Sequence, residues 1–444
     1  MARPEFKAIV VGGGPCGITA AYCLHLAGID FAVLERRDSS FENVGASVVL
    51  SAPTLRVMYQ FGILEDVLAI GCEIGAARSF TADGKLMKSS EMFKRMKDNH
   101  GHGPVAYHRA QLIEVMYKRL PEEAKAKFHF NKKLVDIESN EDGVKATCDD
   151  GSTYEGSVII GADGVHSRTR LIMRDMALKA NPSASWDPEL PYTATYNLLW
   201  ACFPRPTEEM GQGYDTQDQD RSIMYVTGRD MAWVFLYKKL AEPTKGYVSY
   251  KQEDIDAVAE EFKDFHVNET LTVKELWKTK MGTGMTTLDE GIAKHWSWGR
   301  IVLVGDACHK FTPNAGAGLN NGISDIVTLC NGLREEIHAD PSGNPTQNNL
   351  TKMFAAYQSS RIAGLQADAS LSANLTRVQA WATPVHYFLS KYVMCSSLIE
   401  HYMVALFISK AMSTAPVLNY VPGEEPLKGA VPWTHPIPAR VEKM

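Results

Sequence analysis

The 444-residue chain lacks the cysteine spacing of a structural metal site or a disulfide framework. Its eight cysteines include no C-x-x-C pair and no close cluster with histidine. It also lacks an excess of basic residues, because 46 Lys and Arg stand against 52 Asp and Glu, for a net charge of −6. A nucleic-acid-binding protein needs a basic patch that neutralises phosphates. We therefore expect no nucleic-acid partner, and a location in a reducing compartment, the cytoplasm.

Long uninterrupted apolar runs are also absent. The apolar stretch 385–408 is interrupted by Lys391 and Glu400 before about 18 apolar residues accumulate. Residues 8–29 carry no Asp, Glu, Lys or Arg, but the Gly-Gly-Gly-Pro at 12–15 would break a membrane helix. We expect no membrane-spanning segment. The C-terminal apolar region should pack on the rest of a monomer or form a homodimer contact, with peripheral binding to an internal membrane as the alternative.

A glycine-rich turn joins a short β-rich run at residues 7–11 to a helical pattern. Gly12 permits the tight turn, Gly14 lets a pyrophosphate approach the backbone, and Gly17 lets helix and strand pack closely. The phosphate charge would lie at the helix N-terminus. Glu35 ends the next apolar run, where its carboxylate can accept hydrogen bonds from ribose hydroxyls. The unit predicts a bound dinucleotide.

The glycine unit alone does not separate FAD from NAD. Glu35 argues against NADP at this site, because its charge would repel a 2′-phosphate. We assign the neighbouring Arg36 to the same cofactor site. Two later segments have a similar form: residues 155–170 combine an apolar strand with an Asp-Gly turn, and residues 300–327 combine one with a Gly-Asp turn and a Pro/Gly loop.

With these three motifs the sequence resembles the FAD-dependent monooxygenases of the aromatic-hydroxylase type (group A), most closely their fungal secondary-metabolism epoxidase and hydroxylase branch. The resemblance implies an α/β fold, with a Rossmann-like FAD-binding domain, an inserted mixed-sheet substrate domain and a C-terminal helical region. The expected FAD-binding segments are 1–75, 106–180 and 291–365. The expected substrate-domain segments are 76–105 and 181–290, and the expected C-terminal helices and extended tail are 366–444.

The Gly-Asp segment predicts contacts to the flavin. Asp306 at a strand end can accept a hydrogen bond from a ribityl hydroxyl, and Gly316 and Gly318 allow the backbone to approach a flat ring. A helix beginning near Leu319 would direct its positive end at the negative charge of a reduced flavin. The cofactor-binding residues predicted in this loop are Pro313, Gly316, Gly318, Leu319 and Asn320.

The resemblance extends the cofactor site to residues elsewhere in the chain. It gives Asp163 and Gly164 contacts to both flavin and nicotinamide nucleotide, although Asp163 could instead be a simple Asx-turn residue. Arg109, at the start of a predicted helix, would pair with the pyrophosphate or hold the ribityl side. Val49 lies in the segment expected across the flavin from the substrate, at a position that is often occupied by a smaller residue.

Aromatic and β-branched runs dominate residues 181–290. Trp233, Phe235 and Tyr237 alternate, which places them on one face of a strand, either as the wall of an apolar substrate cavity or as ordinary core. Tyr196 is chosen as a catalytic helper because its strand resembles the family strand that faces the flavin.

Three histidines could suggest a metal site. His100 and His102 flank Gly101 in a polar stretch, and no acidic or cysteine partner completes a ligand set with them or with His108. We therefore expect a solvated loop at residues 100–102 and no metal.

The resemblance implies an NAD(P)H-dependent monooxygenase with bound FAD, NADPH or NADH as a transient reductant, and O2 as co-substrate. A flavin C4a-hydroperoxide would epoxidise or hydroxylate an electron-rich, largely apolar small molecule, a terpenoid, meroterpenoid or indole alkaloid of secondary metabolism. The cofactor performs this chemistry, so few catalytic side chains are expected, with Tyr196 and Arg109 as helpers. A Baeyer–Villiger oxygenase and a flavin reductase or oxidase are the alternatives.

Overall fold

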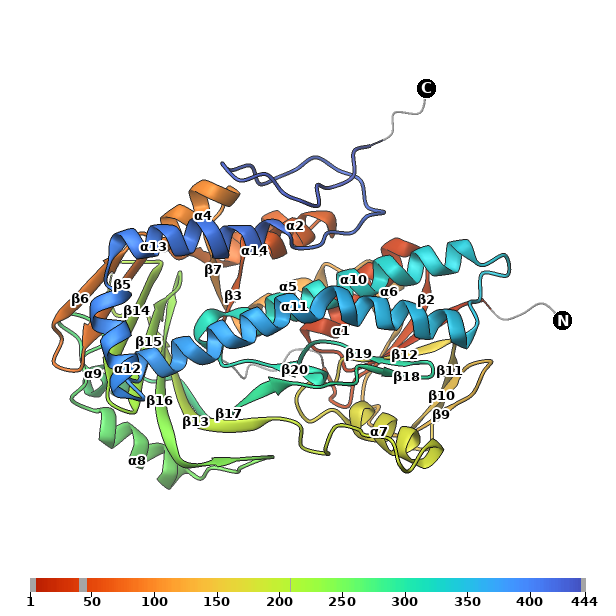
Figure 1. The fold of residues 1–444 in the computed structure, drawn as a ribbon, viewed down its shortest axis with the longest axis horizontal. Helices are drawn as coiled ribbons and strands as arrows, with labels where there is room; N and C mark the ends of the chain where they lie inside the picture. Colours follow the sequence, from red (N-terminus) through yellow and green to blue (C-terminus); the bar gives the residue numbers. More distant parts are fainter. Residues whose placement is uncertain (1–4, 40–45, 208, 441–444) are drawn as a thin grey trace.

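The computed structural model describes residues 5–39, 46–207 and 209–440. Figure 1 shows two sheet regions, with long helices running across them and the C-terminal helices along one outer edge. This mixed α/β architecture confirms the fold class predicted from the sequence, including a C-terminal helical region.

The first sheet has six strands in the order β18-β19-β12-β1-β2-β8. β1 pairs in parallel with both β2 and β12, and Ile9 and Val10 at its centre are fully buried. A parallel strand covered on both faces needs a continuous apolar run, which explains why AIVV and VII form strands here. The strands are β1 (Lys7–Val11), β2 (Asp30–Leu34), β8 (Phe128–His129), β12 (Val158–Gly161), β18 (Ser297–Trp298) and β19 (Ile301–Leu303).

Helices cover this sheet and share its hydrophobic core. α1 begins at Pro15, whose fixed φ suits the first helical turn, and ends at Gly28 in the left-handed conformation. The helices outside the C-terminal region are α1 (Pro15–Ala27), α2 (Ala52–Gln60), α3 (Leu64–Ile70), α4 (Met92–His100), α5 (Arg109–Lys118), α6 (Glu122–Lys125), α7 (Arg168–Ala180), α8 (Gln252–Phe262), α9 (Val273–Trp277), α10 (Ala317–Ala339) and α11 (Gln347–Gln379).

The second large sheet is mixed, with the strand order β20-β17-β13-β16-β15-β14-β5-β6. Only its β14–β5 pair is parallel, and its other pairs are antiparallel. Its strands are β5 (Ala76–Thr81), β6 (Leu86–Ser90), β13 (Thr193–Pro204), β14 (Gln212–Asp218), β15 (Arg221–Thr227), β16 (Met231–Thr244), β17 (Gly282–Ile292) and β20 (His309–Lys310).

The two faces of the second sheet have different surroundings. Val234 and Leu236 of β16 belong to one apolar cluster with residues of α8 and α9. Trp233, Phe235 and Tyr237 belong to another cluster on the opposite face. The alternation predicted for these three rings is therefore confirmed, and we call their side of the sheet the aromatic face.

Two small sheets complete the strand inventory. β3 (Ser47–Leu50) pairs with β7 (Val105–His108), which also pairs with β4 (Cys72–Glu73). The other sheet contains β9 (Leu134–Ser139), β10 (Val144–Cys148) and β11 (Thr153–Gly156). Because His108 ends β7 and Arg109 begins α5, this pairing fixes both residues beside β3.

The C-terminal region begins with two helical segments, Pro384–Val393 and Ser397–Ser413. They comprise α12 (Pro384–Phe388), a π-helical turn (Leu389–Val393), α13 (Ser397–Met403), a second π-helical turn (Val404–Ile408) and α14 (Ser409–Ser413). Within the described residues, no single helix has the length and apolarity to cross a membrane. These two segments meet that test only together, with a bend of 99° between them.

The prediction of a solvated loop at residues 100–102 is wrong for His100. This side chain is fully buried at the end of α4, and its ring lies 4.9 Å from that of Trp433. The C-terminal tail covers it, a contact between residues more than 300 positions apart that local polarity does not reveal. Burial, with Arg56 nearby, lowers the pKa of His100 to about 4.

The same tail is held by a buried arginine. Arg56 is fully buried, donates to both carboxylate oxygens of Glu425 at 2.9 and 2.7 Å, and donates to the His435 carbonyl at 2.6 Å. Its guanidinium also lies 4.2 Å from the centre of the Trp433 ring. The tail is therefore docked by a bidentate ion pair and a cation–π contact.

We predict that Arg56→Met destabilises the protein by about 3–5 kcal/mol, because it leaves a partly buried carboxylate without its partner. The measurement is the urea unfolding midpoint. Lys85→Met is the matched control, because Lys85 and Asp83 form an ion pair at the surface. Equal midpoints for both variants would contradict the anchoring role of Arg56.

Candidate functional site

The turn after β1 has the geometry required of a dinucleotide loop. Gly12 has φ +104°, and a Cβ added there would lie 2.6 Å from the Ala162 carbonyl oxygen. A Cβ at Gly17 would lie 1.9 Å from the Gly12 carbonyl oxygen. Both positions therefore require glycine, one for its backbone conformation and one for close packing of helix and strand.

Gly14 has a different reason to be glycine. It is the N-cap residue of α1, its φ is −72°, and no described atom lies within 4 Å of an added Cβ. The space beside Gly14 is thus left open by the protein itself. No side chain caps α1 within the described residues and no acidic residue lies in its first turn, so this N-terminus can receive an anion.

Glu35 lies where the sequence predicts, at the end of β2 beside the glycine turn. Its carboxylate accepts hydrogen bonds from the Gly13 N–H at 2.6 Å and from the Arg37 N–H at 2.9 Å. These bonds fix the carboxylate next to the N-terminus of α1, and each oxygen keeps further acceptor capacity. Arg36 follows with an exposed side chain.

The loop before α10 forms a second open helix N-terminus. Pro313 begins a short 3₁₀ turn, Pro313–Ala315, and Gly316 follows with φ +62°. α10 begins at Ala317, two residues before the predicted start near Leu319. Among the residues described, no side chain caps this 23-residue helix and its first turn contains no acid. Its first N–H groups therefore point their positive end outward.

The Gly305–Asp306 turn brings the two helix N-termini together. A Cβ added at Gly305 would lie 2.9 Å from the Cys16 Sγ in the first turn of α1. A Cβ added at Gly318, in the first turn of α10, would lie 3.9 Å from an Asp306 carboxylate oxygen. Asp306 also forms an ion pair with Lys310. The Gly305–Asp306 turn thus lies beside the first turns of both helices.

The charge of Asp306 is stabilised by its surroundings. Burial opposes ionisation, but the Lys310 ammonium, with His309 and Arg109 contributing, holds the pKa of this carboxyl below its ordinary value. Asp306 is therefore a carboxylate at neutral pH, able to accept hydrogen bonds from hydroxyl groups.

Arg109, the first residue of α5, lies near this centre. Its guanidinium makes no hydrogen bond or ion pair with any residue that the structure describes, and it is exposed. The surrounding protein nevertheless lowers its pKa by desolvation, while Asp306 acts in the opposite direction. This guanidinium is therefore free, among the described residues, to pair with an anionic group of a ligand.

The carboxylate of Asp163 is used by the protein itself. It accepts hydrogen bonds from the Ser167 hydroxyl at 2.5 Å, from the Thr169 N–H at 2.9 Å and from the Thr169 hydroxyl at 3.0 Å. These bonds organise the start of α7, as expected of a turn residue. Gly164 has φ +79° and no described atom within 4 Å of an added Cβ, so the backbone of this turn borders open space.

Asn320 also has its side chain engaged. Its Oδ1 accepts hydrogen bonds from the Ser51 N–H and hydroxyl and from the Thr54 hydroxyl at 2.6–3.0 Å. Its Nδ2 donates to the Val49 carbonyl at 2.9 Å and to the Gly316 carbonyl at 2.8 Å. Asn320 therefore braces the α10 N-terminus against β3, and Val49 packs 3.6 Å from an added Gly316 Cβ.

A buried network that no sequence motif predicted lies behind the Gly305 turn. Asp325 of α10 accepts hydrogen bonds from the Gly305 N–H at 3.0 Å and from Arg361 at 2.8 Å, and lies 2.5 Å from His309 Nε2. Despite burial, His309 and Arg361 hold the pKa of Asp325 below its usual range. Cys308, His309 and Asp325 lie close enough to share a metal ion, but the aspartate already has protein partners.

The aromatic face adjoins this site. Tyr196, Trp233, Phe235 and Tyr237 form a buried cluster with the partly buried Ala46 packed against it. The Ala46 carbonyl accepts a hydrogen bond from the Arg109 N–H at 3.3 Å. Ala46 therefore connects this aromatic cluster to Arg109.

Several polar atoms on the aromatic face have no hydrogen-bond partner among the described residues. They are the hydroxyls of Tyr196 and Tyr237 and the indole N–H of Trp233. Burial raises the pKa of Tyr196 to about 12, so its hydroxyl is protonated at neutral pH. Buried polar atoms normally have partners, and a bound molecule could supply them.

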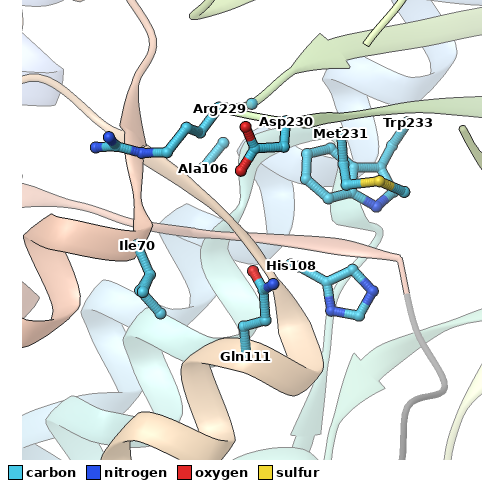
Figure 2. Close-up of a pocket in the computed structure, with 9 residues that line it drawn as sticks. Ile70, Ala106, His108, Gln111, Arg229, Asp230, Met231 and Trp233 are labelled. Atoms are coloured by element: carbon cyan, nitrogen blue, oxygen red, sulfur yellow. The ribbon is translucent and has the colours of Figure 1, made fainter. Parts of the chain in front are cut away.

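A small pocket opens between α5 and the aromatic face. Figure 2 shows His108 and Gln111 on one side, and Asp230, Met231 and Trp233 on the other. The rings of His108 and Trp233 are 6.2 Å apart, and the buried His108 Nδ1 also has no partner in the described part of the chain. Burial lowers the pKa of His108, which favours its neutral form. The sequence analysis weighed this histidine only as a metal ligand.

Comparisons with known proteins agree with this geometry. The family model described as FAD binding domain matches residues 5–346. The FAD-dependent monooxygenase DEP2 of Alternaria brassicicola is 30% identical over 449 aligned positions, covering 99% of this chain and 84% of that protein. The FAD-dependent monooxygenase dpchE of Colletotrichum higginsianum is 32% identical, covering 89% of this chain and 85% of that protein.

Solved structures share the fold at low sequence identity. Klebsiella pneumoniae HpxO, complexed with FAD and uric acid, has a TM-score of 0.71 and 18% identity, covering 91% of this chain and 97% of its own. The tetracycline destructase Tet(51) has a TM-score of 0.64 and 17% identity, covering 94% of this chain and 100% of its own. From the matched domain, the relatives and the two open helix ends together, this chain belongs to the FAD-dependent monooxygenases.

Proposed function

We propose that this flavoenzyme uses NADPH or NADH and O2 to epoxidise or hydroxylate an electron-rich, largely apolar small molecule of secondary metabolism, through the flavin C4a-hydroperoxide expected from its sequence. The domain assignment, the cytoplasmic location and a monomeric or homodimeric state accompany this proposal as predictions. The observation that carries it is the meeting of two helix N-termini, neither capped by a described side chain, at the Gly305–Asp306 turn. Arg109 lies nearby, and its guanidinium has no partner among the described residues.

The residues fit an extended flavin dinucleotide, with a separate contact for each part. The N-terminus of α1 at Gly14 would receive the pyrophosphate, and Glu35 would accept hydrogen bonds from the ribose hydroxyls. Asp306 would bind the ribityl chain, and the N–H groups at residues 316–319 would face the ring. Arg109 would pair with the pyrophosphate or the ribityl side.

Not every predicted contact would use a side chain. The side chains of Asp163 and Asn320 form hydrogen bonds within the protein. We therefore propose that the backbone of their segments, and not these side chains, would shape the cofactor site. Gly164 beside open space would allow the flavin, and transiently the nicotinamide nucleotide, to approach this turn. Val49 would contact the flavin from β3, where it packs close to Gly316.

The aromatic face supports an apolar substrate with hydrogen-bonding oxygen atoms. Its rings would supply the apolar wall. The Tyr196 and Tyr237 hydroxyls and the Trp233 N–H are buried without partners among the described residues, so we propose that they turn toward a bound substrate and orient it. Water exclusion by this face would protect the reactive oxygen species from decay. Tyr196 would act by orienting the substrate, since burial keeps its hydroxyl protonated.

The visible spectrum of the purified protein tests the proposal. We expect an oxidised-flavin spectrum that bleaches under NADPH without air, and recovers when air is admitted. Incorporation of one atom of labelled O2 into product then separates a monooxygenase from a reductase or oxidase, and the position of that oxygen separates ring insertion from epoxidation or hydroxylation. A protein that stays colourless after reconstitution with FAD would overturn the proposal.

Gly14→Leu is predicted to fold and to lose FAD. An added Cβ at Gly14 meets no described atom within 4 Å, and the rest of the leucine side chain would fill the space proposed for the pyrophosphate. Loss of two hydrogen bonds to a charged group, at about 1.5–3 kcal/mol each, weakens binding on the order of 100-fold or more. The measurement is the FAD dissociation constant, with unfolding followed separately. Gly364→Leu is the control, because its added Cβ also meets nothing within 4 Å among the described atoms. Tight FAD binding by Gly14→Leu would refute the pyrophosphate placement.

Asp306→Ala is predicted to weaken FAD binding about 10-fold or more, because it removes a charged hydrogen-bond acceptor. Isothermal titration of the apoprotein with FAD measures the change. Lys310→Ala separates the two roles of this carboxylate, since it breaks the ion pair but leaves the acceptor in place. If Asp306→Ala binds FAD as tightly as the parent, the ribityl role is wrong.

A further inference from the structure

The C-terminal helical pair, residues Pro384–Val393 and Ser397–Ser413, has its apolar side facing outward. Seven large apolar side chains on it are 55–69% exposed. A surface helix of a globular protein normally turns its apolar stripe toward the core. The exposed residues are Val385, Phe388, Tyr392, Leu398, Tyr402, Leu406 and Phe407.

The exposed side chains follow helical spacing. Leu398, Tyr402 and Leu406 are four residues apart and form one stripe along the second segment. Val385, Phe388 and Tyr392 are spaced by three and four residues along the first. Each segment therefore presents a continuous apolar stripe, and not single exposed residues of the kind found on most protein surfaces.

The inward side of the pair is mainly polar, since Val404 is the one apolar side chain among its five buried residues. Glu400 is buried, forms an ion pair with Lys88 of β6 at 2.5 Å, and accepts hydrogen bonds from the Ser90 hydroxyl at 2.6 Å and the Glu91 N–H at 3.0 Å. Despite burial, Lys88 and Ser90 hold the pKa of Glu400 below its ordinary value.

Buried serines continue this inward polar side. The Ser390 hydroxyl donates to the Gln217 side chain of β14, and the Ser409 hydroxyl accepts a hydrogen bond from Asn99 of α4 at 2.8 Å. The pair is thus attached to the protein by polar contacts, along the outer edge seen in Figure 1 beside α4. Its apolar stripes remain exposed and are therefore available to contact an apolar phase outside the protein.

The charges on the pair are also asymmetric. Its one carboxylate, Glu400, is turned inward and neutralised, whereas Lys391 and Lys410 are exposed. The outward surface therefore combines apolar and aromatic side chains with positive charge and carries no acid. This combination is complementary to the boundary between anionic headgroups and acyl chains of a lipid bilayer.

We propose that the C-terminal helical pair binds the surface of a phospholipid bilayer, with its apolar stripes in the headgroup region. Tyr392 and Tyr402 have the amphipathic rings that favour this region. The 99° bend lets both short segments lie along the membrane surface. This docking would place the second sheet, to which the pair is attached, beside a phase that concentrates apolar substrates. The inference concerns the surface of the protein and is independent of the flavin chemistry.

Flotation of the full-length holoprotein with vesicles tests this proposal. The probes are vesicles of phosphatidylcholine alone and of phosphatidylcholine with phosphatidylserine. We expect the parent protein to float with the vesicles, and Leu406→Ser with Phe407→Ser to lower the partition coefficient at least about 10-fold. Tyr247→Ser with Met281→Ser is the matched control, because both side chains are exposed and lie outside the C-terminal pair. FAD content is measured in every variant. A variant that keeps its FAD has kept its fold and its flavin site, so a loss of vesicle binding then comes from the surface of the pair.

Two further measurements decide between occupants. Lys391→Gln with Lys410→Gln should reduce the preference for phosphatidylserine, and the light-scattering mass of the parent should match that of the Leu406→Ser, Phe407→Ser variant. The proposal is overturned if the parent protein does not bind vesicles, or if the Leu406→Ser, Phe407→Ser variant binds them as well as the parent. It is also overturned if these substitutions convert a dimer into a monomer and no vesicle binding is seen. That result would assign the stripes to a contact with a second copy of the chain.

Discussion

Two helices of the first sheet region, α1 and α10, begin without a side-chain cap from any described residue, and the rest of the proposed site depends on this constraint. Their first N–H groups need negatively charged or acceptor groups as partners. α7 provides the contrast within the same protein, since Ser167 and Asp163 satisfy its start. The N-termini of α1 and α10 are therefore available to negatively charged groups of a ligand. FAD, the cofactor of this family, carries phosphates that can bind at such a helix N-terminus.

The surrounding structure keeps these ends in position. Asn320 ties the start of α10 to β3, and Asp325 ties the Gly305 turn to α10 and α11. β7 then connects the cofactor region to the aromatic face, because His108 lies near Trp233 while Arg109 follows it. The end of β7 thus lies between the proposed flavin site and the aromatic face proposed to bind the substrate.

Local sequence patterns predicted helices, strands and turns well, but they did not predict contacts between residues far apart in the sequence. The glycine turn, Glu35 and the alternation of Trp233 with its neighbouring rings follow from local spacing, so they could be predicted without a structure. Asn320 bonds to Ser51, Thr54 and Val49, about 270 positions away, and His100 is covered by a tail more than 300 positions away. No local pattern encodes such contacts. Asp163 and Asn320 use their side chains within the protein, so a motif can indicate a segment without defining which of its atoms would face the proposed cofactor site.

A crystal structure of the holoprotein tests the central claim most directly, because electron density would locate each part of the flavin. The account predicts the pyrophosphate at the N-terminus of α1 beside Gly14, the ribityl chain at Asp306, and the flavin ring at the N-terminus of α10 with one face toward the aromatic face. A flavin whose phosphates lie away from α1, or whose ring lies away from residues 316–319, would contradict it.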